Sequence, residues 1–261
     1  MAFTAMLLLL SVVGNIVLLK ETKSFYTRIQ AVRLDPLGKS ARNIYRFDED
    51  NTQRRLLIVG DSRAAEWQIP NEFLNYEIVN GGIGSQTTAQ VFGRIHEDLD
   101  HTQPDIVLIQ AGINDLKTLA LFPERREEII TNCKSNLENI VAHSAEGDRT
   151  VILSTIFPVG RPSMARRIVW SSDVATGVDE VNKHLNSLSA KNVIILDSFS
   201  ILYGVDGLIM REYSKDTLHL NDAGYTILNK ELMNILEEID GRRGTPQPSL
   251  TTTGGGGDQL H

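Results

Sequence analysis

Three residue types that together can perform nucleophilic catalysis stand at two points of the sequence. Ser62 follows the apolar run Leu56–Val59, and Asp216 and His219 stand three residues apart just before a C-terminal amphipathic segment. A serine hydroxyl attacks a carbonyl carbon at neutral pH only when a neighbouring base takes its proton. His219 is the candidate base, and Asp216 could hold the second ring nitrogen in the required tautomer. The pattern predicts a serine-dependent acyl-transfer site.

The elements that must position these residues alternate between strands and helices from residue 56 onward. Strands are predicted at Leu56–Val59, Tyr76–Asn80, Asp105–Gln110, Thr150–Phe157 and Val193–Leu196. Helices are predicted around Val91–Leu99, at Glu124–Ser144, and over 174–189 and 221–239. Aliphatic strands separated by helices predict an α/β fold, with a parallel five-stranded sheet covered on both faces. Functional residues in such a fold gather beyond the carboxyl ends of the strands.

Two further segments at strand ends offer hydrogen-bond donors. Asn80–Ser85 begins at the end of the second predicted strand, and Asn114 and Asp115 follow the third. The negative charge that develops on a carbonyl oxygen requires preorganised donors. The N–H of Ser62, an N–H of the turn after the second strand and the amide of Asn114 could supply them. Asn and Asp also favour helix N-caps. The other candidate catalytic segments at strand ends nevertheless favour a catalytic role for Asn114. Asp61 and Asp115 are interpreted as structural.

Composition narrows the classes of function. The chain of 261 residues has a formal net charge of −7, which argues against a nucleic-acid partner because no basic surplus can replace counterions. The single cysteine, Cys133, allows no internal disulfide and is interpreted as a buried structural thiol. No glycine-rich nucleotide motif is present, so no cofactor is expected. No metal site is expected either, because four histidines lack partners at ligand spacing: His96, His101, His143 and His184.

The two ends of the chain differ from the middle. Residues 2–19 carry no charge and, as a helix, would span about 27 Å, close to the thickness of a bilayer core. We therefore expect residues 1–22 to be a single membrane anchor, with a signal segment as the second interpretation, 23–54 a connector and 55–240 the catalytic domain. Lys20, Lys23 and Arg28 favour a cytoplasmic domain, but the side of the membrane stays open. Residues 241–261 are rich in Gly and Thr, which predicts a disordered tail.

Four sequence blocks, in this order, resemble the SGNH hydrolases, also called the GDSL esterase/lipase family. Gly60-Asp61-Ser62 looks like the nucleophile block, Asn80–Ser85 the second, Gly112–Asp115 the third, and Asp216-x-x-His219 the last. The glycine that donates an oxyanion N–H in the family falls on Ser85 here, and a one-residue slip would give that role to Gly84. Arg63 replaces the leucine of the family's name, a change expected to affect only the rim of the site.

The resemblance implies a flavodoxin-like α/β/α sandwich that cleaves ester or thioester bonds through an acyl-enzyme without a metal. It implies Ser62, Asp216 and His219 as the triad and Ser62, Ser85 and Asn114 as the oxyanion hole. The expected substrate is a small-molecule, lipid or carbohydrate ester. Three alternatives stay open: an O-acyltransferase on the same fold, an inactive membrane-tethered binding module, and an ordinary α/β-hydrolase. An ordinary α/β-hydrolase would need the motif Gly-x-Ser-x-Gly, and the last position of that motif is Ala64 here.

A basic segment after the fourth predicted strand is the one sequence feature that bears on the substrate. Residues 158–167 include Arg161, Arg166 and Arg167, and Trp170 follows. The segment could wall the site and favour an acidic or carbohydrate-bearing ester. A plain solvated loop explains the same residues equally well.

Overall fold

The chain folds around one five-stranded parallel sheet. A computed structural model describes residues 2–42, 47–48, 53–70 and 75–244. The strands are β1 (Arg54–Gly60), β2 (Tyr76–Gly82), β3 (Ile106–Gln110), β4 (Thr150–Ser154) and β5 (Val193–Leu196). They lie in the order β2-β1-β3-β4-β5, and every neighbouring pair is parallel. This order is the flavodoxin-like one, so the predicted fold class is confirmed.

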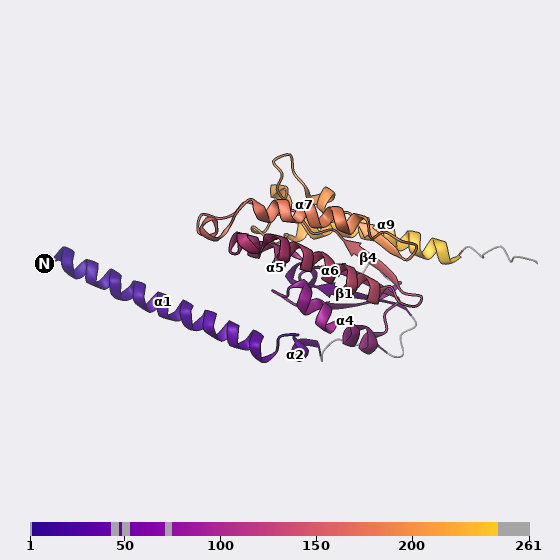
Figure 1. Ribbon diagram of the computed structural model, residues 1–261, viewed down its shortest axis with the longest axis horizontal. Helices are drawn as coiled ribbons and strands as arrows, with labels where there is room; N and C mark the ends of the chain where they lie inside the picture. The colour runs from indigo at the N-terminus through magenta and orange to yellow at the C-terminus, as the bar shows by residue number, and fades with distance from the viewer. Residues whose placement is uncertain (1, 43–46, 49–52, 71–74, 245–261) are drawn as a thin grey trace, which may run out of the picture.

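Helices cover both faces of the sheet and complete three layers (Figure 1). One face packs against α4 (Thr88–Thr102), α6 (Arg126–Ser144) and α7 (Asp173–Asn186). The other face packs against α3 (Ser62–Ala65), α8 (Ser198–Leu202) and α9 (Asp222–Gly244). Shorter pieces connect these elements: α2 (Lys39–Arg42), α5 (Ile113–Leu116), η1 (Lys117–Ala120), η2 (Pro123–Arg125), η3 (Arg166–Val169) and η4 (Arg211–Tyr213).

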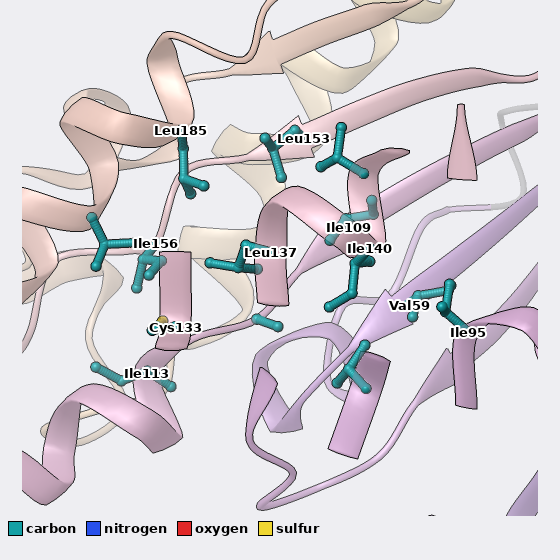
Figure 2. Close-up of a cluster of buried hydrophobic side chains, with 14 of the residues drawn as sticks. Val59, Ile95, Ile109, Ile113, Cys133, Leu137, Ile140, Leu153, Ile156 and Leu185 are labelled. Carbon is teal, nitrogen blue, oxygen red and sulfur yellow. The ribbon is translucent and has the colours of Figure 1, made fainter. Parts of the chain in front are cut away.

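The aliphatic strands divide their side chains between two cores. On β1, Leu57 and Val59 belong to the core beneath α4, α6 and α7, whereas Leu56 and Ile58 belong to the core beneath α9. This alternation follows from the two-residue period of a strand. Figure 2 shows the first core, where Cys133 lies among aliphatic side chains such as Leu137. Cys133 is fully buried, and burial raises the pKa of its thiol. The interpretation of a structural thiol agrees with this position.

One strand is shorter than its apolar run predicts. β4 ends at Ser154, although the prediction extended it to Phe157. The chain leaves the sheet there because side chains and loops take over its hydrogen bonds: the N–H of Ile156 donates to Asn182 at 2.7 Å, and that of Gly160 donates to the carbonyl of Thr217 at 2.8 Å. Residues 155–160 are nevertheless buried. The apolar residues that follow Ser154 are therefore explained by burial near the His219 turn rather than by pairing in a strand.

The N-terminal helix stands apart from the domain. α1 runs from Ala2 to Leu34, contains no buried residue and projects away from the sheet (Figure 1). It therefore continues through the first part of the predicted connector. Of the rest of that connector, residues 43–46 and 49–52 lie outside the described residues. The C-terminal helix α9 reaches Gly244, beyond the predicted start of the tail, and residues 245–261 lie outside the described residues.

Candidate active site

The nucleophile segment turns sharply where β1 meets α3. A Cβ atom on Gly60 would lie 1.8 Å from the carbonyl oxygen of Gln110, so only glycine allows this close approach of β1 and β3. Asp61 then caps α3, because its Oδ1 accepts the N–H of Arg63 at 2.9 Å. Ser62 is the first residue of α3 and is half-buried. The turn thus presents the Ser62 hydroxyl at the carboxyl end of the sheet.

The Asp216–His219 turn brings its histidine to this hydroxyl. The Oγ of Ser62 lies 3.0 Å from Nε2 of His219, across 157 positions of sequence. Nδ1 of His219 lies 2.9 Å from Oδ2 of Asp216 and 3.1 Å from Oδ1. The three side chains therefore form a continuous hydrogen-bonded chain of the kind that can activate a serine.

Backbone hydrogen bonds keep Asp216 ionised. Burial acts to raise the pKa of this carboxyl, but its Oδ1 accepts the N–H groups of Leu218 at 2.7 Å and His219 at 2.9 Å. These bonds and the interaction with the His219 side chain outweigh burial and lower the pKa of Asp216 to about 2. At neutral pH the carboxylate is charged and can accept the proton on Nδ1 of His219.

Ser62 itself and the turn after β2 carry N–H groups that can bind a substrate oxygen. Among the described residues, the N–H groups of Ser62, Gly84 and Ser85 have no acceptor. A Cβ atom on Gly84 would lie 4.0 Å from the Cβ of Ser62, which places this turn against the nucleophile. Ser85 has a φ of 67°, a left-handed conformation that glycine adopts more readily. This backbone supports aligning Ser85 with a glycine position.

Asn114 lies beside this turn and is held in place. Its Nδ2 donates to the carbonyl oxygen of Gln86 at 3.0 Å, and its Oδ1 accepts from Nζ of Lys117 at 2.6 Å. The amide Nδ2 carries two hydrogens, so one stays available for a second acceptor. Asn114 is buried, and its orientation is therefore set before any substrate arrives.

Lys117 is a residue of the site that the sequence interpretation missed. It stands three residues after Asn114, a spacing that brings two side chains together on a helical turn and could have indicated the contact. Burial lowers the pKa of the Lys117 amine; the nearby charge of Asp61 opposes this effect, and that of Arg166 adds to it. The Lys117 amine thus holds the Oδ1 end of the Asn114 amide.

The two acidic residues interpreted as structural have structural contacts. Asp115 accepts both the N–H and the hydroxyl of Thr88, at 2.9 and 2.7 Å, and so ties α5 to the start of α4. Asp61 is fully buried, and its Oδ2 has no hydrogen-bond partner among the described residues. Burial raises the pKa of Asp61 to about 6. Within the same described part of the chain, no three His, Cys, Asp or Glu side chains are grouped as metal ligands.

A family model decides the class of protein. The model described as the GDSL-like Lipase/Acylhydrolase family matches residues 58–227, which is more than half of the chain and includes Ser62, Asn114, Asp216 and His219. The chain belongs to this family. It is accordingly an ester-hydrolysing enzyme, and the resemblance drawn from the four sequence blocks is confirmed.

Individual relatives agree with the family. The chain is 24% identical over 237 residues to platelet-activating factor acetylhydrolase IB subunit alpha1 of Bos taurus, covering 85% of this chain and 94% of that one. It is 31% identical over 116 residues to an arylesterase of Vibrio mimicus, covering 39% of this chain and only 54% of that relative. A GDSL-like lipase structure from Bacteroides thetaiotaomicron superposes with a TM-score of 0.58 at 20% identity, over 71% of this chain and 89% of that one.

The residue that departs from the family's name has a different place from the one expected. Arg63 is fully buried, not on the rim of the site. Its guanidinium donates to the carbonyl oxygens of Leu218 at 2.7 Å, Phe157 at 3.0 Å and Pro158 at 3.4 Å. Leu218 directly precedes His219, so Arg63 ties α3 to the turn that carries the candidate base. The expectation was wrong because a cation is normally solvent-exposed, and only the fold supplies three carbonyl groups that can accept from it.

Proposed function

We propose that this GDSL-family enzyme hydrolyses carboxylic ester or thioester bonds through an acyl-enzyme at Ser62. The observation that supports the proposal most strongly is the contact of 3.0 Å between Oγ of Ser62 and Nε2 of His219, with Asp216 on the opposite ring nitrogen. In the first step Oγ attacks the carbonyl carbon while Nε2 takes the hydroxyl proton. The tetrahedral intermediate collapses, and the alcohol or thiol leaves with the proton that Nε2 returns.

The second half of the proposed cycle reverses these roles. A water molecule gives its proton to Nε2 of His219 and attacks the acyl carbon, and the carboxylic acid leaves as Oγ of Ser62 recovers the proton. In both steps the oxyanion is held by the N–H groups of Ser62 and Ser85 and by Nδ2 of Asn114. The N–H of Gly84 is the alternative to that of Ser85 as the second donor. All of these donors are protein groups, so the proposed mechanism needs no metal ion or cofactor.

The test is covalent labelling of the full chain in detergent with a fluorophosphonate, followed by mass spectrometry of the peptides. We expect an adduct on Ser62 that is absent from Ser62→Ala and from His219→Ala, because Oγ is nucleophilic only when its base is present. The single thiol, Cys133, is buried and does not compete. Folded protein that forms no adduct would refute the proposal and would favour an inactive binding module.

We further propose that α1 anchors the enzyme in a membrane. The helix is long and apolar enough to cross a bilayer, and none of its residues is buried against the domain. A signal sequence near the N-terminus has the same properties, and the mass of the mature protein separates the two. Retention of residues 1–22 together with resistance to alkaline extraction supports an anchor. A mature chain that lacks them would mark a cleaved signal.

A further inference from the structure

Exposed apolar side chains of the domain gather at one end of the sheet. Outside α1, every large apolar residue that is exposed in the described part of the domain lies in a segment that follows β3, β4 or β5: Leu121, Phe122, Met164, Ile168, Val169, Tyr203 and Val205. Parallel strands end at the same edge, so these segments lie at the end that carries Ser62. Such a concentration on one end, rather than scattered over the surface, is typical of a docking surface.

The segment after β4, residues 160–170, contributes three of these seven residues, more than either of the other two segments. Met164 is 84% exposed and Ile168 is 87% exposed. Between and beside them stand Arg161, Arg166 and Arg167, with no acidic residue in the segment, although the whole chain carries a charge of −7. Apolar side chains interleaved with cations are the composition that enters the headgroup region of a bilayer with anionic lipids.

The surroundings of two of these three arginines leave their charge available. Arg161 pairs with Asp206 at 2.7 Å, and the guanidinium of Arg166 lies 5.7 Å from the ring centre of Trp170. Arg167 has no ion pair among the described residues and is exposed. Two of the three arginines can therefore face lipid phosphates without first leaving a carboxylate partner.

The N-terminal helix leaves the domain beside the same site. The turn after α1 packs on the segment that follows β2: Nε2 of Gln90 donates to the carbonyl oxygen of Pro36 at 2.7 Å, and a Cβ atom on Gly38 would lie 2.7 Å from Cδ1 of Ile83. α1 and the 160–170 segment, which leads into α7, project toward the same end of the molecule (Figure 1). A bilayer entered by α1 would thus face the 160–170 segment.

Helix α1 continues between its uncharged part and the domain. Residues 20–34 of the helix, beyond its uncharged part, are about 22 Å long at 1.5 Å per residue. A tilt of α1 from the bilayer normal shortens the distance that these residues span. The membrane anchor, the cations and the shared direction together favour a lipid surface as the partner of the apolar end.

We propose that the 160–170 segment docks on the anionic surface of the bilayer that α1 enters. Met164 and Ile168 reach the boundary of the acyl chains, and Arg166 and Arg167 lie at the phosphates. Resting on the proposed esterase function, the consequence is that Ser62 receives amphiphilic esters from the bilayer surface. The N–H of Gly160 donates to the carbonyl of Thr217 at 2.8 Å, and the hydroxyl of Thr217 donates to the carbonyl of Arg161 at 3.2 Å, so the docked segment begins beside the turn that carries His219.

The test uses an environment-sensitive label on the full chain. Ile168→Cys, labelled with nitrobenzoxadiazole, is reconstituted through α1 into vesicles of equal parts phosphatidylcholine and phosphatidylglycerol. The natural thiol of Cys133 is buried and stays unlabelled. Glu146→Cys is the matched control, since residue 146 is exposed in the turn before β4, at the opposite end of the sheet. Met164→Cys serves if Ile168→Cys does not fold.

We expect the label at residue 168, but not at 146, to emit at shorter wavelength and to be quenched by lipids that carry nitroxide on the acyl chain. Arg166→Gln with Arg167→Gln should lower the ratio of docked to undocked label about thirtyfold, since each cation near an anionic surface contributes about fivefold. The signal does not require turnover, so Ser62→Ala must behave like the parent even if the esterase proposal is wrong.

Two results would overturn the docking proposal. A label at residue 168 that emits as it does at residue 146, and is insensitive to acyl-chain quenchers, would show that the segment stays in water. A label that is shielded but unaffected by those quenchers, with shielding that grows as the protein-to-lipid ratio rises, would assign the surface to a second copy of the chain.

Discussion

Replacing Arg63 with leucine tests whether the buried guanidinium positions His219. In the parent, this side chain joins α3 to the carbonyl groups of Phe157, Pro158 and Leu218. Leucine restores the residue of the family's name, but it carries no charge and donates no hydrogen bond. The turn that carries His219 would keep its internal bonds to Asp216 and its contact with Ser62, but it would lose the bond from Arg63 to Leu218.

The expected loss of stability follows from two opposing contributions. Three buried carbonyl groups lose their donor, at a cost of about 2 kcal/mol each. Removing the cation offsets part of this cost: burial lowers the pKa of Arg63 from 12.5 to about 10, which corresponds to about 3 kcal/mol of unfavourable free energy. The net change in the free energy of unfolding is a loss of about 3 kcal/mol. For activity, a displacement of His219 by about 1 Å lowers kcat on the order of a hundredfold.

The assay measures kcat and KM on a short water-soluble aryl ester, at a temperature where circular dichroism shows the variant folded. We expect kcat to fall and KM to hold, because Arg63 is buried and has no surface for substrate. Leu232→Ala is the matched control: Leu232 is fully buried in the middle of α9, and its truncation costs about 2–5 kcal/mol. It should match the loss of stability and retain the parent kcat.

A kcat of Arg63→Leu equal to that of Leu232→Ala, at a similar loss of stability, would contradict a positioning role for Arg63. Arg63 would then be a structural residue of the core without influence on the position of His219. Arg63→Lys adds an intermediate case, since one ammonium group cannot reach all three carbonyl groups. Its kcat should lie between those of the parent and of Arg63→Leu.

Three further outcomes are expected. Asn114→Ala should lower kcat roughly a hundredfold or more through loss of one oxyanion donor, and turnover of short esters at the parent rate would show that the oxyanion assignment is wrong. Ser85→Gly should raise the free energy of unfolding by about 1 kcal/mol, because it removes a left-handed non-glycine residue, and should keep activity; complete loss would mean that the serine side chain takes part. Asp61→Asn should be more stable than the parent at pH 8, by up to about 3 kcal/mol, since the pKa of this buried carboxyl is about 6 in the folded state against 3.8 ordinarily. The parent loses this stability as pH rises from about 4 through 6, so urea unfolding at pH 4 should show little difference; a difference that is the same at both pH values would contradict the pKa of Asp61.

The aliphatic runs of the sequence predicted the strands, and the strands predicted where chemistry would gather. A run such as Ile106–Gln110 is buried on both faces only in a parallel sheet under two layers of helices. Because the carboxyl ends of such strands converge, residues as distant as Ser62 and His219 could be expected to meet, and the structure brings them within 3.0 Å. The family model agrees with this inference about the class of enzyme.

The fold class, the family and the set of candidate catalytic residues were therefore predictable from the residues alone. The tertiary structure decided what those residues contact. Arg63 donates to carbonyl groups that stand 94 to 155 positions further along the chain, and no local pattern encodes acceptors at that distance. Exposure is likewise decided only by packing. Met164 and Phe157 are both apolar and both follow β4, yet the side chain of Met164 is in solvent and that of Phe157 is in the core. A strand's period depends on its own residues, whereas burial of a charge or exposure of an apolar side chain depends on what the rest of the chain places around it.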